Sequence, residues 1–88
     1  MDKIKFVEIN EVLCIHKGIL EEHGGLAGVR DEGLLDSAIN MPRATFNKQY
    51  LHTDIYEMAA AYAYHIIKNH PFLDGNKRVG IAIGVLFL

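Results

Sequence analysis

Nine consecutive residues combine the side chains that a phosphate-transfer reaction requires. Residues 70–78 read His-Pro-Phe-Leu-Asp-Gly-Asn-Lys-Arg. Histidine changes charge near neutral pH, so His70 could accept the proton of an attacking hydroxyl group. Asp74 supplies a hard oxygen ligand, and proteins commonly hold Mg²⁺ through one or two carboxylates together with substrate phosphates. A candidate general base and a candidate metal ligand therefore lie within one short segment.

The residues that follow Asp74 are suited to binding an anion. Gly75 allows the backbone to turn and to approach a phosphate closely. A helix is predicted to begin near Asn76, and the first N–H groups of a helix, with the positive end of its dipole, attract phosphates. Lys77 and Arg78 add two positive charges. Each residue alone also fits an ordinary loop or cap, but together they predict a phosphate cradle, and their spacing is not that of a Walker A loop.

The helices that position this segment follow from hydrophobic periodicity and capping residues. The four predicted helices run from Asn10 to Gly24, from Glu32 to Asn40, from Ile55 to Asn69, and onward from Asn76. Asn10 is the predicted N-cap of the first helix, Asp31 is that of the second, and Thr53 or Asp54 is that of the third. Residues 3–7 are either an edge strand or an extended lead-in, and residues 43–52 are either a loop or a short hairpin. The predicted fold class is therefore all-α.

The last predicted helix differs from the others in composition. Residues 79–88 carry no charge, and a helix that is apolar all round is typically buried on every side. No polar or capping residue follows Leu88, so we expect a further helix or a partner chain to cover this helix. Self-association through the same helix is an alternative. Residues 1–88 are accordingly expected to form one domain that lacks its C-terminal helix or helices.

Length and composition limit the function classes. The chain has 88 residues, of which 50% are hydrophobic and 23% charged, as expected for one small globular domain. The net charge of -2 disfavours direct binding to nucleic acid. The single cysteine, Cys14, excludes an internal disulfide framework and is expected to be a buried, inert thiol. There is no apolar secretory region, and residues 79–88 are about half a membrane span, so a cytoplasmic protein without membrane contact is expected.

Residues outside the motif are interpreted mainly as structural. His16 and His23 lie two helical turns apart, which is too far for a compact metal pair, so His16 is expected to be half-buried or near a helix cap. Arg30 is either an ordinary loop residue or a residue at the edge of a cleft. Tyr62 is expected in the core, and Tyr64 is expected to be partly exposed.

Residues 70–78 resemble the active-site motif of the Fic/Doc family, which usually reads His-Pro-Phe-x-Asp/Glu-Gly-Asn-Gly/Lys-Arg. A second segment, residues 24–35, reads Gly-Gly-Leu-Ala-Gly-Val-Arg-Asp-Glu-Gly-Leu-Leu and is followed by Ser37-Ala38 and Pro42. This segment is similar to the death-on-curing, or Doc-like, branch of the family. The resemblance covers most of the chain and implies a compact helical domain with a central apolar helix after the motif.

The resemblance also implies a role for each motif residue. His70 would be the base that deprotonates a target hydroxyl, Asp74 would ligate Mg²⁺ at the nucleotide phosphates, and Phe72 would anchor the loop against the core. Asn76, with the amides of the following helix, would form an anion hole. The implied phosphate-binding residues are Gly75, Asn76, Lys77 and Arg78. Residues 43–52 would correspond to a flap that aligns the target segment.

Two positions distinguish between branches of the family. Members that transfer AMP have glycine at the position of Lys77, and commonly a second arginine at the position of Ile81. The resemblance therefore implies a Doc-like toxin of a type II toxin–antitoxin system that transfers the ATP γ-phosphate. Its target would be a hydroxyl of a translation factor, elongation factor Tu, so translation would stop, and the tail of a cognate antitoxin would bind the toxin. The alternatives are a Fic-type AMP-transferase and an inactive, truncated remnant that only binds an antitoxin.

Overall fold

The computed structural model describes residues 4–88 as four α-helices, one 3₁₀ turn and a small antiparallel hairpin. The all-α class expected from the sequence is confirmed. The elements are α1 Ile9–His23, α2 Glu32–Asn40, η1 Met41–Arg43, β1 Thr45–Phe46, β2 Gln49–Tyr50, α3 Ile55–Asn69 and α4 Asn76–Phe87.

The ends of α2 and α3 lie where the sequence predicts them. The Asp31 side chain accepts a hydrogen bond from the backbone N–H of Leu34 at 2.9 Å, and Asp54 accepts one from Glu57 at 2.8 Å. Such side-chain acceptors satisfy N–H groups that have no partner within the helix. Of the two N-cap candidates for α3, Asp54 is therefore the residue used.

The N-cap of helix α1 is Glu8, two residues earlier than predicted, because Glu8 and Glu11 form a capping box. The backbone N–H of Glu8 donates to Glu11 Oε1 at 3.0 Å, and the Glu8 side chain accepts in return from the backbone of Glu11. This reciprocal pair satisfies two N–H groups at once. Asn10 therefore lies inside the helix instead of capping it. The helix ends as predicted at Gly24, whose φ is 79°.

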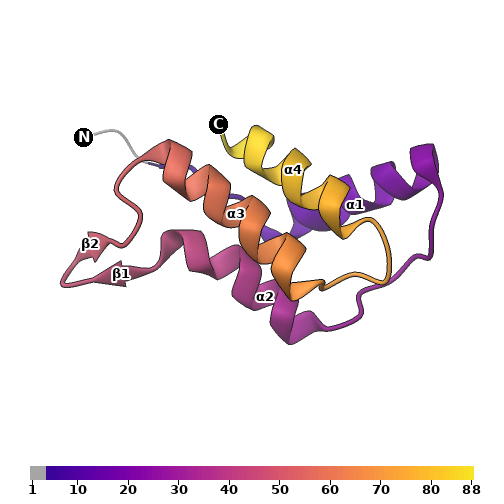
Figure 1. Cartoon of the computed structure of the whole chain (residues 1–88), viewed down its shortest axis with the longest axis horizontal. Helices are drawn as coiled ribbons and strands as arrows, with labels where there is room; N and C mark the ends of the chain where they lie inside the picture. The colour runs from indigo at the N-terminus through magenta and orange to yellow at the C-terminus, as the bar shows by residue number, and fades with distance from the viewer. Residues whose placement is uncertain (1–3) are drawn as a thin grey trace.

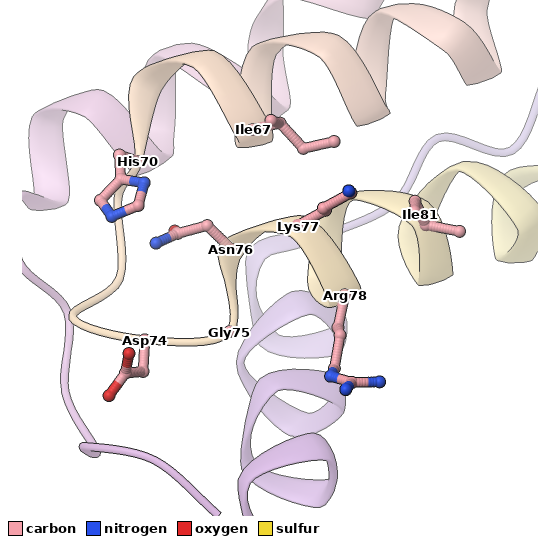
Figure 2. A pocket seen from close by; sticks show the side chains of 8 residues that line it. All are labelled: Ile67, His70, Asp74, Gly75, Asn76, Lys77, Arg78 and Ile81. Carbon is pink, nitrogen blue, oxygen red and sulfur yellow. The ribbon is translucent and has the colours of Figure 1, made fainter. Parts of the chain in front are cut away.

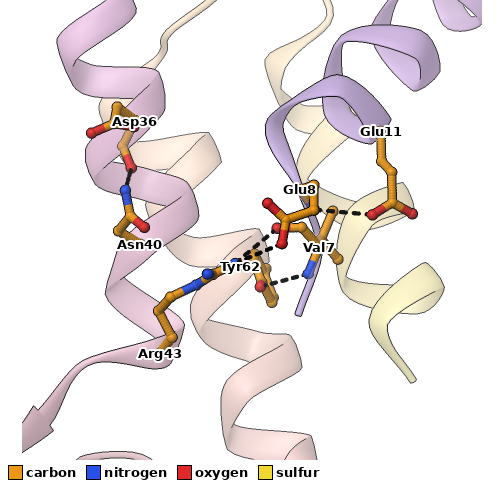
Figure 3. Close-up of polar contacts among 7 residues, drawn as sticks. All are labelled: Val7, Glu8, Glu11, Asp36, Asn40, Arg43 and Tyr62. Carbon is orange, nitrogen blue, oxygen red and sulfur yellow. Dashed lines mark hydrogen bonds and ion pairs between the residues drawn. The ribbon is translucent and has the colours of Figure 1, made fainter. Parts of the chain in front are cut away.

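The segment before α1 is extended and forms no strand within the described residues. Val7 is buried, and its N–H donates to the Tyr62 hydroxyl at 3.0 Å. Arg43 donates to the carbonyl oxygen of Val7 at 3.3 Å and lies 3.6 Å from the Glu8 carboxylate (Figure 3). These contacts fix the lead-in against α3 and η1.

Residues 43–52 contain a short hairpin, one of the two expected alternatives. Thr45 pairs with Tyr50 and Phe46 with Gln49. Asn47 and Lys48, at the turn, have positive φ values of 52° and 64°. Two-residue turns with positive φ match the twist of the strands that they join.

Helix α3 is the central element of the fold. It lies between α2 and α4, and α1 packs against α4 (Figure 1). The residues buried where these helices meet form one apolar core: Val7, Val12, Leu35, Ala38, Ile39, Tyr62, Ile66, Phe72, Val79 and Ile83. Two glycines of α4 allow a close approach to α3, since a Cβ on Gly84 would lie 3.0 Å from the Ala59 carbonyl oxygen. A Cβ on Gly80 would lie 2.8 Å from Ile67 Cγ1.

Among the described residues, α4 is covered on one side only, and the predicted burial of Cys14 is wrong. In α4, Ile83 is fully buried, but Val85 is 66% exposed and Ile81 is 51% exposed, so the cover expected from the sequence is not supplied by residues 4–88. Among the described helices, α3 and α1 cover one side of α4, and its other side faces outward.

Cys14 is exposed. It lies two residues from both Val12 and His16, which are buried, and a step of two residues along a helix leads to the opposite face.

Within residues 4–88, none of the helices combines the length and apolar character needed to span a bilayer.

Candidate active site

The motif is a tight connection between α3 and α4. We call residues 70–75 the motif loop. It begins at His70, which has a left-handed backbone (φ 53°, ψ 54°), and ends at Gly75, which has a φ of 82°. Left-handed residues at both ends reverse the chain within a few residues. Histidine adopts this conformation rarely, so the contacts around His70 must hold it.

The predicted polar residues of the motif line one pocket of about 620 Å³ (Figure 2). Its lining is His70, Asp74, Gly75, Asn76, Lys77 and Arg78, together with Ile67 and Ile81. Figure 2 shows Lys77 projecting to the side of Ile67 and Ile81, whereas Arg78 projects in the opposite direction. A candidate base, a carboxylate and two cations thus surround one space.

Phe72 lies behind the pocket and is fully buried. Its ring stacks on the imidazole of His16 from α1, with centroids 3.8 Å apart and planes inclined by 12°. Its backbone forms an antiparallel bridge with Val29. The structure therefore places Phe72 where an anchor of the loop would lie.

Asn76 uses its side chain within the motif loop. Its Oδ1 accepts from the N–H of Phe72 and its Nδ2 donates to the Phe72 carbonyl oxygen, each at 2.9 Å. The residue is only 4% exposed. The first intrahelical bond of α4 runs from Val79 N to Gly75 O at 2.9 Å, so the N–H groups of residues 76–78 precede it. These backbone groups are what α4 can offer to an anion, and one Nδ2–H of Asn76 is not used by its bond to Phe72.

Asp74 is oriented by a backbone group of the α1–α2 connection. Its Oδ2 accepts a hydrogen bond from the N–H of Leu26 at 2.7 Å. This bond leaves the second carboxylate oxygen for a ligand. One hard carboxylate beside an anion-binding helix start fits Mg²⁺, which typically completes its coordination with phosphate oxygens and water.

Comparisons with known proteins identify the family of the chain. The model of the Fic/DOC family matches residues 6–88. The chain belongs to the Fic/DOC family. The "Protein kinase doc" of Escherichia phage P1 is 28% identical over 85 residues, which cover 97% of this chain and 67% of that protein. The "Toxin Doc" of Mycolicibacterium smegmatis (strain ATCC 700084 / mc(2)155) is 40% identical over 65 residues, or 74% of this chain and 50% of that protein. No solved structure matched the chain.

Both relatives are Doc proteins, so they support the Doc-like branch inferred from residues 24–35. This Fic/DOC chain spans two thirds of the length of one relative and half of the other.

The hairpin of this Fic/DOC chain does not lie beside the motif. Figure 1 shows β1 and β2 near the start of α3, at one end of the molecule, and the motif loop at the other end of α3. Helix α3 contains 15 residues, so it is about 22 Å long at 1.5 Å per residue. The expected flap is therefore not positioned at this pocket.

Two residues that contact the motif loop were not assigned to the site from the sequence. His16 Nε2 lies 2.9 Å from the carbonyl oxygen of Asp74. Arg30 donates through Nε to the carbonyl oxygen of His70 at 2.7 Å, and through Nη2 to that of Asn69 at 2.9 Å. The sequence did contain one indication for His16. It lies on the apolar face of the first predicted helix, where a buried polar ring needs a hydrogen-bond partner. For Arg30 the sequence left two alternatives open, and its contacts with His70 and Asn69 favour the one beside the cleft.

Proposed function

We propose that this chain carries the active site of a Doc-like toxin that transfers the γ-phosphate of ATP to a hydroxyl group of a protein. The observation that supports the proposal most directly is the single pocket that His70, Asp74 and the first residues of α4 line together. Membership of the Fic/DOC family, and the printed name of the phage P1 relative, support the same reaction.

His70 acts as the general base. It accepts the proton of the substrate hydroxyl as the hydroxyl oxygen forms a bond to the γ-phosphorus. The bond between that phosphorus and the β–γ bridging oxygen breaks, and ADP leaves. His70 is exposed at the pocket, which allows a protein substrate to reach it.

The start of α4 binds the phosphates. The N–H groups of residues 76–78 and the side chains of Lys77 and Arg78 supply positive charge where the phosphoryl group moves. Asp74 would hold Mg²⁺, which neutralises charge on the nucleotide phosphates when bound. Gly75 lets the backbone approach the nucleotide without a Cβ in the way.

Transfer of the γ-phosphate, and not of AMP, follows from the resemblance at two pocket residues. Lys77 stands where AMP-transferring members have glycine, and the aliphatic Ile81 stands where they commonly have arginine. We further propose that the substrate is a translation factor, elongation factor Tu, that its modification arrests translation in the cytoplasm, and that a cognate antitoxin restrains the toxin. These statements rest on the resemblance of residues 24–35 and 70–78 to the Doc-like branch. The printed names of the two relatives give only a kinase and a toxin, and the chain spans only part of their length.

The test uses ATP labelled at the α- or the γ-phosphate. The chain is mixed with Mg²⁺ and a bacterial translation extract, and protein-bound label is followed by gel electrophoresis. We expect γ-label on one main protein band, whose mass identifies the target. Protein-bound α-label would instead establish AMP transfer, and absence of both labels would leave antitoxin binding as the function.

Three variants connect the label to the pocket. His70→Ala should abolish labelling, and His70→Asn, which tolerates the left-handed backbone better, should do the same. Asp74→Asn keeps an acceptor for the Leu26 N–H but removes the charge, so labelling should fall and lose its Mg²⁺ dependence. Thermal unfolding must show that all three variants remain folded. Undiminished labelling by a folded His70 variant would refute the assignment of the base.

A further inference from the structure

The motif loop is held from outside the pocket at both of its ends, by residues of α1 and of the α1–α2 connection. We propose that Arg30 and His16 are positioning residues: Arg30 orients His70, and His16 orients Asp74. Their kinetic effects rest on the function proposed above, whereas their effect on the loop does not. Neither side chain lines the pocket, so neither is proposed to contact the substrate.

Arg30 holds the end of the loop that carries His70. Its Nε and Nη2 donate to two successive carbonyl oxygens, those of His70 and Asn69, at 2.7 and 2.9 Å. These are carbonyl groups at the C-terminus of α3, where a helix leaves its last acceptors unpaired. The guanidinium presents its donors in a fixed planar arrangement, so two bonds define the orientation of the peptide groups on both sides of the His70 Cα atom. These two bonds therefore fix the direction in which the His70 side chain leaves the backbone.

The backbone around Arg30 supports this contact. The N–H groups of Arg30 and Asp31 both donate to the Pro71 carbonyl oxygen, at 2.6 and 3.1 Å. The N–H of Leu73 donates to the carbonyl oxygen of Gly28 at 3.1 Å. Residues 28–31 thus run alongside residues 71–73 and pair with them. Arg30 reaches the carbonyl groups from a segment that is itself fixed to the motif loop.

His16 holds the end of the loop that carries Asp74. Its Nε2 lies 2.9 Å from the Asp74 carbonyl oxygen, which can only accept, so the ring hydrogen must be on Nε2. The ring is 6% exposed and is stacked on Phe72. Asp74 is then fixed twice, through its carbonyl by His16 and through its carboxylate by the N–H of Leu26.

The two residues should affect different kinetic constants. Loss of Arg30 would misdirect the base, which acts in the chemical step, so kcat should fall while KM for MgATP changes little. Loss of His16 would loosen the metal carboxylate, so KM for MgATP should rise. Removal of a group that orients a metal ligand typically costs 10–100-fold in metal affinity or activity.

Matched substitutions separate positioning from packing. His16→Phe keeps an aromatic ring on Phe72 but has no donor, whereas His16→Gln places an amide N–H near the position of Nε2. Arg30→Gln removes the planar pair of donors. Lys17→Ala, at the exposed neighbour of His16, is the control. All variants are assayed in the whole chain with γ-labelled ATP, Mg²⁺ and the labelled protein band as readout, and their melting temperatures are compared.

We expect His16→Phe to raise KM for MgATP about 10-fold or more, and His16→Gln to restore it. Arg30→Gln should lower kcat about 10-fold or more at nearly constant KM. Lys17→Ala should match the unmodified chain. Equal kinetic losses in His16→Phe and His16→Gln, each in step with a lower melting temperature, would show a role in packing only and would overturn the proposal.

Amide hydrogen exchange of Phe72 and Leu73, whose N–H groups are hydrogen-bonded, tests positioning without any enzymatic assay. In the chain alone, His16→Phe and Arg30→Gln should exchange these amides about 10-fold faster, while amides in the middle of α3 remain unchanged. If the unmodified chain labels no protein, the proposed function fails, and this measurement still decides on positioning. Unchanged exchange in both variants would refute the proposal, whatever the kinetics.

Discussion

The side chain of Asn76 stabilises the turn that the catalytic motif must make. The Oδ1 and the Nδ2 of its amide are both paired with the backbone of Phe72, and the residue is only 4% exposed. Among the polar motif residues, it is therefore the one whose loss should mainly reduce stability.

Asn76→Ala should lower the free energy of unfolding by about 1–3 kcal/mol, because a buried N–H and a buried C=O lose their partners. Asn76→Asp should be at least as harmful, since a carboxylate cannot donate to the Phe72 carbonyl oxygen. Urea unfolding measures both. If activity were lost while the stability of both variants stayed unchanged, the amide would have to act on the ligand.

His65 makes the stability of the fold sensitive to pH. Burial lowers its pKa below the ordinary value of 6.5, and the positive charges of Lys68 and His52 lower it further. The unfolded chain therefore binds a proton more readily than the folded chain. The neutral His65 ring therefore makes its full contribution to folding stability above pH 6.5. This contribution is lost as the pH falls through the lower folded-state pKa.

His65→Gln removes this group, so its stability should change less than that of the unmodified chain between pH 7 and about pH 5. Urea midpoints of both proteins across this range provide the measurement. A difference between the two proteins that stays constant with pH would contradict the lowered pKa.

At the scale of single elements, the contact between α3 and α4 depends on glycine. A Cβ on Gly84 would lie 3.0 Å from a backbone oxygen of α3, which cannot move away without shifting the helix. Gly18 in α1 offers a contrast, because a Cβ there would meet nothing within 4 Å.

Gly84→Ala should therefore destabilise the fold by about 1–2 kcal/mol, the cost of overpacking less the gain in helix propensity. Gly18→Ala should stabilise it by about 0.5–1 kcal/mol through helix propensity alone. Chemical denaturation of the two variants gives the comparison. Stabilisation of equal size at both positions would mean that α3 and α4 are farther apart than described.

The ends of α2 and α3 were predictable because the residues that set them are local. Asp31 and Asp54 each bind an N–H group three residues further on, and Pro71 follows the end of α3. The motif residues were also predictable, since they form one contiguous segment.

The support of His70 and Asp74 by Arg30 and His16 was not predictable, because these contacts join residues 40 and 58 positions apart. The exposure of α4 depends on what packs against it, which its uniformly apolar sequence does not reveal.

At the scale of the whole molecule, helix α4 has one apolar face that is exposed and one that is buried in the core. Ile81 and Val85 in this helix, and Leu88 directly after it, are each at least half exposed, whereas Val79 and Ile83 are fully buried. The two faces should therefore respond very differently to substitution.

Val85→Lys should change the free energy of unfolding by less than about 0.5 kcal/mol, as exposed substitutions usually do. Ile83→Ala should cost about 2–5 kcal/mol, because it leaves a cavity in the core. Thermal and urea unfolding of the whole chain test both. A loss in Val85→Lys as large as that in Ile83→Ala would show that the open face is covered in solution.

The long-range bonds around the motif loop also bear on the order of folding. The contacts of Arg30, Leu26 and His16 with the loop span 40, 48 and 58 positions of the chain. Closing such long segments costs more chain entropy than forming a single helix, and it slows the contacts that require it. We therefore expect α3 and α4 to form before Arg30, Leu26 and His16 make their contacts with the motif loop. On a ribosome, α1 and the connection after it would emerge before the motif, so these residues can acquire their active geometry only after residues 70–78 have emerged.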